Sequence, residues 1–187
     1  MALALDVDEL ILNRSIAWLE HAVIGLNLCP FAKAVHVKKK ICWRLSIASD
    51  VDTLLSDLRV ALLGLSVAPV EEIETTLLIH PYTLADFADY NDFLALADAL
   101  IVELGLEGVL QIASFHPNYC FADAFPEDLS NATNQSPYPM LHLLREDSIS
   151  QAVQIYPDAH AIVARNQATL ARMGRQQWQT LTKRFAT

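Results

Sequence analysis

The chain has 187 residues, of which 53% are hydrophobic, and a formal net charge of −9 at pH 7. This length is enough for one domain with a substantial core, and the negative charge argues against nucleic acid or an anionic membrane surface as the main partner. The longest charge-free apolar runs are shorter than the roughly 18 residues of a membrane-spanning helix, and the acidic N-terminus lacks the basic region of a signal peptide, so we expect a cytoplasmic protein.

The first predicted element is an amphipathic helix over residues 10–26, with apolar residues at helical intervals and acidic residues just before it. The stretch Cys29-Pro-Phe-Ala-Lys33 follows. Proline favours the first position of a helix, so we expect a short helix with Cys29 at or next to its N-cap.

Three predicted strands and two predicted helices then alternate along the chain. The strands are residues 41–48, 75–79 and 108–115, and the helices lie at about 50–65 and 83–105. The expected N-caps of these helices are Ser49 or Asp50, and Thr83 or Asp86. Successive βαβ units are right-handed and parallel, so the three strands should end at one edge of the sheet, where open α/β sheets bind ligands.

The remainder of the chain begins with a long polar loop, residues 117–138, whose aromatic side chains favour a packed conformation. Residues 140–144 predict a fourth strand, and residues 157–187 predict a C-terminal helical extension that begins at Pro157-Asp158 and breaks at Gly174. The expected fold is a single α/β domain over residues 1–187. Its central sheet has three parallel strands plus a fourth strand and is flanked by helices.

Two predicted strands end in His-Pro pairs, which places His80 and His116 at the same edge of the sheet. Imidazole titrates near neutral pH, so both are candidate catalytic residues, and His116 is a candidate acid–base group. Alternatively, both rings only bond to their own loops. Two histidines are a weak metal signal because zinc would need a third ligand. We therefore assign no metal site, and the cofactor is unknown.

The third catalytic candidate is Cys29. The chain has three cysteines without CxxC spacing, which argues against a disulfide framework and a zinc knuckle. A helix N-terminus stabilises a thiolate, and Lys33 lies about one turn further on, so Cys29 is a candidate nucleophile. The alternative is a small buried hydrophobic residue.

Several other residues are candidate ligand-binding groups. Arg145 is a rare cation in an acidic stretch, and a guanidinium suits a carboxylate or phosphate, although Glu146 offers a neutralising partner. Polar side chains of the 117–138 loop either fold over the site or bond to their own backbone. The candidates are Lys33, Asn118, Tyr119, Asn134, Tyr138 and Arg145.

Three stretches together resemble a bacterial family of uncharacterised proteins, the domain of unknown function 1415 family. They are Leu26-Asn-Leu-Cys-Pro-Phe-Ala-Lys33, Ser114-Phe-His-Pro-Asn-Tyr119 and Thr133-Asn-Gln-Ser-Pro-Tyr-Pro-Met-Leu-His-Leu-Leu-Arg-Glu146. The third stretch has Gln135 where the family pattern has arginine. The resemblance covers nearly the whole chain but implies no activity.

We predict an enzyme that acts on a small anionic metabolite at a Cys/His pocket on the C-terminal edge of the sheet. In this hypothesis Cys29, His80 and His116 do the chemistry, and Lys33 and Arg145 hold the anion. The alternative is a non-catalytic module that binds a ligand or a partner. A homodimer formed through the terminal helices around Trp178 is a further possibility.

Overall fold

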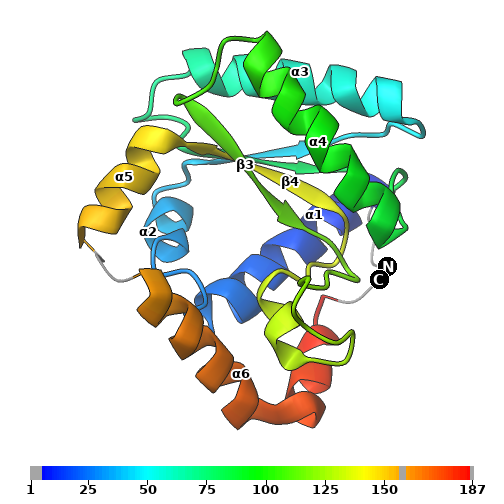
Figure 1. Ribbon diagram of the computed structural model, residues 1–187, viewed down its shortest axis with the longest axis vertical. Coiled ribbons are helices and arrows are strands. Elements are labelled where there is room, and N and C mark those ends of the chain that lie inside the picture. Colours follow the sequence, from blue (N-terminus) through cyan, green and yellow to red (C-terminus); the bar gives the residue numbers. More distant parts are fainter. Residues whose placement is uncertain (1–5, 156–158, 186–187) are drawn as a thin grey trace, which may run out of the picture.

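The computed structural model describes residues 6–155 and 159–185, and shows a four-stranded sheet between two layers of helices (Figure 1). The strands are β1 (Ile41–Leu45), β2 (Thr75–Ile79), β3 (Leu110–Phe115) and β4 (Met140–Arg145). The α-helices are α1 (Val7–Trp18), α2 (Ala32–Val37), α3 (Val51–Val67), α4 (Phe87–Glu103), α5 (Glu146–Ile155) and α6 (Ala159–Thr182). A π-helical segment, η1 (Leu19–Ile24), continues α1, and a short 3₁₀ helix, η2 (Leu129–Thr133), lies between β3 and β4.

The sheet is mixed, with strand order β1-β2-β4-β3. β1 and β2 pair in parallel, whereas β4 pairs antiparallel with both β2 and β3. The predicted set of three adjacent parallel strands is therefore wrong, because β4 is inserted between β2 and β3. Its residues Leu141 and Leu143 are fully buried, which suits a central strand better than an edge strand. Since β2 and β3 are both antiparallel to β4, the strands β1, β2 and β3 still run in the same direction.

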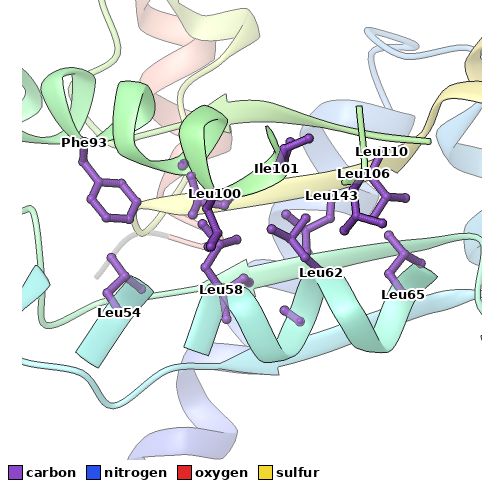
Figure 2. Packing of buried hydrophobic residues seen from close by; sticks show 14 of the residues in the cluster. Leu54, Leu58, Leu62, Leu65, Phe93, Leu100, Ile101, Leu106, Leu110 and Leu143 are labelled. Atoms are coloured by element: carbon purple, nitrogen blue, oxygen red, sulfur yellow. The ribbon is translucent and has the colours of Figure 1, made fainter. Parts of the chain in front are cut away.

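Helices α3 and α4 cover one face of the sheet (Figure 1). Figure 2 shows a row of leucines on α3 facing apolar side chains of α4 and of the sheet. The predicted N-caps are confirmed, since Asp50 accepts a hydrogen bond from the Thr53 N–H, and Asp86 accepts from the Ala88 and Asp89 N–H groups. This α3/α4 layer contains one of two apolar clusters in the described residues.

Helix α1 and η1 lie on the other face of the sheet, and α6 packs outside them against η1 and η2 (Figure 1). Buried aromatic residues Trp18 and Trp178 belong there to the same apolar cluster as the β2 residues Leu77 and Ile79. Successive side chains of a strand point to opposite faces, so the neighbouring Leu78 belongs to the α3/α4 layer. We call this second side the α1/α6 layer.

The C-terminal segment forms α6, which continues through a kink at Gly174. Gly174 has φ of 71°, a left-handed conformation that glycine adopts without steric cost, so the predicted break is confirmed. The predicted start at Pro157-Asp158 lies outside the described residues. Within residues 6–155 and 159–185, no helix has the length and apolarity required to cross a membrane.

Candidate functional site

The two histidines that follow β2 and β3 lie at the same edge of the sheet. Ile79 and Phe115, the last residues of these strands, both pair with Met140 at the start of β4. His80 and His116 come directly after them, and both rings contact the ring of Tyr90 on α4. The centroid of Tyr90 lies 5.8 Å from that of His80 and 5.0 Å from that of His116. We call His80, Tyr90 and His116 the histidine cluster.

Both imidazoles donate hydrogen bonds to consecutive carbonyl groups in the turn before α4. His80 Nδ1 lies 3.1 Å from the Thr83 oxygen, and His116 Nε2 lies 3.1 Å from the Leu84 oxygen. A carbonyl oxygen only accepts, so these two nitrogens carry the protons. Leu84 has φ of 60°, a conformation that is unfavourable for a residue with a side chain. The two bonds therefore hold an otherwise unfavourable turn in place.

The histidine cluster is closed to solvent, because the exposed fraction of His80, Tyr90 and His116 is 0%. Burial lowers the pKa of His80 to about 4 and lowers that of His116, so both rings are neutral at pH 7. His116 Nδ1 accepts a hydrogen bond from the Asn118 N–H, whereas His80 Nε2 has no partner in the part of the chain that the structure describes. Neither ring faces a surface from which a substrate could approach.

Cys29 lies on the other side of the sheet. It is partly buried and packs against the apolar cluster of the α1/α6 layer. The expected position at a helix N-cap is wrong, because α2 begins at Ala32 with Phe31 as its N-cap. Lys33 is exposed on α2. The sheet thus separates the thiol from the histidine cluster instead of bringing the three catalytic candidates together.

Tyr138 is also buried in the α1/α6 layer, where its hydroxyl accepts a hydrogen bond from Arg14 at 3.2 Å. It lies one residue before Pro139, whose carbonyl accepts from the His80 N–H. The Tyr138 side chain is therefore engaged with α1 and faces away from the histidine cluster.

Arg145 lies at the opposite edge of the sheet from the two histidines, since it pairs with Leu110 at the beginning of β3. Its guanidinium donates hydrogen bonds to the carbonyl oxygens of Leu65 at 2.8 Å, Ala68 at 2.6 Å and Ile73 at 3.1 Å. Leu65 and Ala68 belong to the C-terminal end of α3, whose last carbonyls have no partner within the helix. Arg145 therefore ties α3 to the sheet.

The remaining loop candidates stay close to His116. The Asn118 side chain is exposed, and the Tyr119 ring packs on Phe87 with centroids 5.1 Å apart. Asn134 makes two hydrogen bonds to the end of β3. Its carbonyl accepts from the His116 N–H, and its Nδ2 donates to the Ser114 oxygen at 3.2 Å. These residues connect the end of β3 to the 117–138 loop.

The 117–138 loop is packed around a fully buried side chain, Asn131. Its Oδ1 accepts from the Phe121 N–H at 3.0 Å, and its Nδ2 donates to the Phe125 oxygen at 2.8 Å. Near the end of the loop, the Gln135 carbonyl accepts from the indole N–H of Trp18 at 2.9 Å. The loop is thus fastened both internally and to α1, which confirms the packed conformation.

A cleft of about 690 Å³ lies between this loop and α6. The two segments lie side by side, with η2 against α6 (Figure 1). Phe121, Leu129 and Val163 give the cleft apolar walls, and Asp123 and Asp128 add two carboxylates. Its volume falls within the range of roughly 300 to 1,000 Å³ that is typical of small-molecule sites. Asn134 also lines it, which places the cleft next to the end of β3.

Among the described residues, the charge of the cleft is one-sided, since none of those that line it is Lys, Arg or His. Hydrogen bonds from the backbone N–H and side chain of Ser130 lower the pKa of Asp128, so this carboxylate is ionised at neutral pH. Asp123 is exposed and carries the same charge. The cleft is therefore an environment that favours cations over anions.

Asn166 on α6 is the buried polar side chain of the cleft, with an exposed fraction of 9%. Its Nδ2 donates to the Leu28 carbonyl oxygen at 2.7 Å, whereas its Oδ1 is closed to solvent and has no hydrogen-bond partner among the described residues. The Leu28 oxygen only accepts, so the amide nitrogen must face it. Asn166 therefore ties α6 to the segment that follows η1.

Comparison with known proteins identifies a family for this chain. A family model described as "Protein of unknown function (DUF1415)" matches residues 11–180. The chain belongs to the DUF1415 family. No curated protein and no solved structure matches it. The DUF1415 match includes all four strands, the 117–138 loop and most of α6, so both the histidine cluster and the cleft lie within the family region.

The polar residues of the cleft were not among the ligand-binding residues predicted for this DUF1415 protein, apart from Asn134. Asn166 lies four residues before the buried Leu170, so both are on the same face of α6. A polar residue on an otherwise apolar helix face was the feature of the sequence that could have identified Asn166. Asp123 and Asp128 carry no comparable signal in a polar loop. Within the described ranges, no group of three or more His, Cys, Asp or Glu side chains is arranged to hold a metal ion.

Proposed function

We propose that this DUF1415 protein is a non-catalytic binding module that takes a small molecule into the cleft between the 117–138 loop and α6. The observation that carries the proposal is the cleft itself. It has a ligand-sized volume of about 690 Å³, apolar walls and a few polar groups, and it lies beside the C-terminal end of β3. This combination is typical of small-molecule sites.

The positions of the catalytic candidates and the composition of the cleft support a binding role over a catalytic role. Cys29 lies in the α1/α6 layer, whereas His80 and His116 contact Tyr90 in the α3/α4 layer, so the sheet separates the candidate nucleophile from the candidate acid–base groups. Within residues 6–155 and 159–185 as described, no Cys, His, Lys or Arg side chain is found in the lining of the cleft. A binding role needs only shape and complementary polar groups, which the cleft provides.

A cleft-filling substitution tests the proposal. Ala171 lines the cleft from α6 and is exposed, so Ala171→Trp should fill the cleft without disturbing the core. Ala168→Trp is the matched control, because Ala168 is exposed on the same helix but does not line the cleft. Fragments that bind the parent protein in ligand-observed NMR should lose binding to Ala171→Trp and keep binding to Ala168→Trp.

The proposal fails if no fragment binds the parent protein, or if both tryptophan variants bind the same fragments equally well. Circular dichroism of both variants verifies that α6 is retained. Since both substitutions add the same side chain to exposed positions of one helix, a difference between them reports on the cleft and not on general stability.

A further inference from the structure

We propose that β1 is a dimerisation edge, on which β1 of a second copy of this chain pairs antiparallel across a two-fold axis at Trp43. The two four-stranded sheets then form one continuous sheet. The residues of β1 do not line the cleft, so this interface is independent of the proposed binding function. It also differs from the terminal helices around Trp178, which is buried in the apolar cluster of the α1/α6 layer.

β1 lies at one edge of the sheet and pairs only with β2. Lys40 and Ser46, on either side of the strand, both bond to backbone groups at the ends of β2, so the even-numbered residues of β1 face β2. The N–H and C=O groups that point outward therefore belong to Ile41, Trp43 and Leu45. Among the described residues, none of these outward groups has a hydrogen-bond partner.

The other edge strand, β3, is protected at both ends. Its odd-numbered residues face β4, so its even-numbered residues point outward. The outward N–H of Leu110 donates to the Leu106 carbonyl at 3.0 Å, and the outward carbonyl of Ser114 accepts from Asn134 Nδ2 at 3.2 Å. Proteins usually cover or interrupt a free edge, because its unpaired groups can pair with another chain. In the described part of the chain, β3 has such protection and β1 has none.

The cations of β1 and its flank do not reach across this edge. Arg44 lies on the α3/α4 face, where a Cβ added at Gly64 would be 3.4 Å from its Nη2. Lys40 Nζ lies 3.9 Å from the Glu74 carboxylate, on the β2 side. The strand contains no proline, and its register with β2 is unbroken from Ile41 to Leu45. β1 therefore keeps a regular edge that can accept another strand.

Pairing with a second copy also joins the apolar side chains of the two strands. In this register Trp43 lies opposite Trp43 of the second copy, and Ile41 lies opposite Leu45. All three side chains are partly exposed and pack against the α1/α6 layer, so they form an apolar stripe that continues into the second sheet. Such cross-strand pairs stabilise antiparallel sheets. Ile47, just after β1, is 74% exposed and lies beside the second copy.

The charges on the two flanks of β1 favour a second copy as the partner. Lys38 and Lys39 precede the strand, Asp50 and Asp52 follow it, and all four side chains are exposed. Antiparallel pairing brings the basic flank of each copy to the acidic flank of the other, whereas parallel pairing would bring like charges together. A two-fold interface must be complementary to itself, and this edge meets that requirement.

The oligomeric state gives the first test. Analytical ultracentrifugation of the full chain at concentrations up to about 100 μM should show a dimer with twice the chain mass of 20.8 kDa. Ile41→Pro removes an outward N–H at the first residue of an edge strand, where proline is tolerated. It should weaken the dimer by about tenfold or more, since two of the symmetric pairs each lose a hydrogen bond.

Ile41→Val is the matched control, because valine keeps both the outward N–H and a β-branched side chain. It should dimerise like the parent protein. Circular dichroism of the two variants verifies that each is folded, so a difference between them reports on the edge.

Arg44→Cys tests the register. Pairing centred on Trp43 places residue 44 opposite Cys42 of the second copy as a non-hydrogen-bonded pair, with Cα atoms about 4.5 Å apart. This separation allows a disulfide, so oxidation with copper phenanthroline should link Arg44→Cys into a covalent dimer. The parent protein and the double variant Arg44→Cys with Cys42→Ser both retain Cys29 and Cys120 and should not be linked.

Charge exchange tests the flanks. Lys38→Glu with Lys39→Glu should weaken the dimer by about tenfold, and adding Asp52→Lys should restore part of the loss. Arg172→Glu with Lys183→Glu changes the net charge equally at exposed positions of the C-terminal segment, and should weaken the dimer less.

The proposed edge is overturned if the chain sediments as a monomer at every concentration, which would leave β1 to solvent or to a different partner. It is also overturned if Ile41→Pro and Ile41→Val dimerise equally, or if Arg44→Cys is linked no better than its Cys42→Ser control. A dimer with these properties would use another surface. None of these outcomes affects the fragment-binding test of the cleft, so the two proposals fail separately.

Discussion

The histidine cluster and the cleft lie next to the same edge of the sheet. The cluster belongs to the α3/α4 layer and the cleft lies beside α6, and the two differ in how far their polar groups are exposed to solvent. In the histidine cluster the rings are closed to solvent, and their N–H groups are bonded to the Thr83 and Leu84 carbonyls. In the cleft, the Asp123 and Asp128 carboxylates and the Gln167 side chain are exposed. Residue types that often catalyse are used here to hold a turn, whereas the polar groups that solvent can reach lie at the open cleft.

Acid provides the strongest test of the closed cluster. The pKa of His80 is lowered by burial to about 4 in the folded protein, from 6.5 in an unfolded chain. Between these values the unfolded state binds a proton that the folded state does not, so stability is lost as the pH falls from about 6.5 toward 4. The loss attributable to His80 is about 3 kcal/mol, at about 1.4 kcal/mol per pH unit. Urea denaturation across this pH range measures the total loss. His142, whose pKa is also lowered by burial to about 4, contributes to it as well, so the share of His80 is the difference between the parent protein and a variant that does not titrate at position 80.

The matched variants for this test are His80→Gln and His21→Gln. Glutamine at position 80 retains a donor for the Thr83 carbonyl but does not titrate, so the slope of stability against pH should decrease by about one proton. His21 is exposed on η1, and its replacement should leave the curve unchanged. Equal slopes in His80→Gln and the parent protein would contradict the closed cluster.

A second prediction concerns Arg145, which was expected to hold an anion. Arg145→Gln should destabilise the protein by about 2 to 3 kcal/mol, because carbonyl oxygens of Leu65, Ala68 and Ile73 lose a charged donor. Arg59→Gln is the control, since the exposed ion pair of Arg59 with Glu103 should contribute less than about 1 kcal/mol. Thermal unfolding compares the two. Loss of ligand binding in Arg145→Gln without loss of stability would restore the anion-holding role.

A substitution of Tyr90 in the histidine cluster should have a smaller effect on the free energy of unfolding. Its hydroxyl donates to the Met140 carbonyl at 2.7 Å and accepts from the Phe115 N–H at 3.1 Å, so it joins β4 to β3. Tyr90→Phe should lower the unfolding free energy by about 1 to 2 kcal/mol. Tyr82, which is 50% exposed, supplies the control Tyr82→Phe. Cleft ligands should bind both variants as they bind the parent protein, and a selective loss in Tyr90→Phe would show that the two sites are coupled.

The smallest expected effect is that of Cys29→Ala. Cys29 is partly buried in apolar packing, so the substitution should cost about 1 kcal/mol or less. Affinity for fragments that bind in the cleft should be unchanged. A large loss of affinity would place the thiol in the binding machinery and weaken the distinction between the closed core and the open cleft.

Several local features were predictable from the sequence because their partners are close along the chain. Asp50 and Asp86 cap the helices that begin next to them, and Gly174 produces the expected break in α6. The position of β4 was not predictable in this way. Its antiparallel insertion between β2 and β3 depends on pairing between residues far apart in sequence, and apolar strands of this kind carry no signal for which neighbour they join.

The candidate site was also predictable only in part from the sequence. The sequence placed His80 and His116 at one edge of the sheet, because both follow strands that run in the same direction. It did not reveal that both rings are closed beneath α4, nor that Cys29 lies across the sheet, since these facts depend on which face each segment covers.

By itself, the sequence determined most of the helices and strands, the N-caps of α3 and α4 and the common edge for the two histidines, all of which follow from periodicity and short-range hydrogen bonding. Tertiary structure alone decided what the polar groups do. Arg145 finds its carbonyl partners 72 to 80 residues away, and Asn166 finds Leu28 at a separation of 138 residues. Whether a polar side chain is satisfied or left free for a ligand depends on such distant partners, because burial and hydrogen bonding are properties of the packed chain and not of its local sequence.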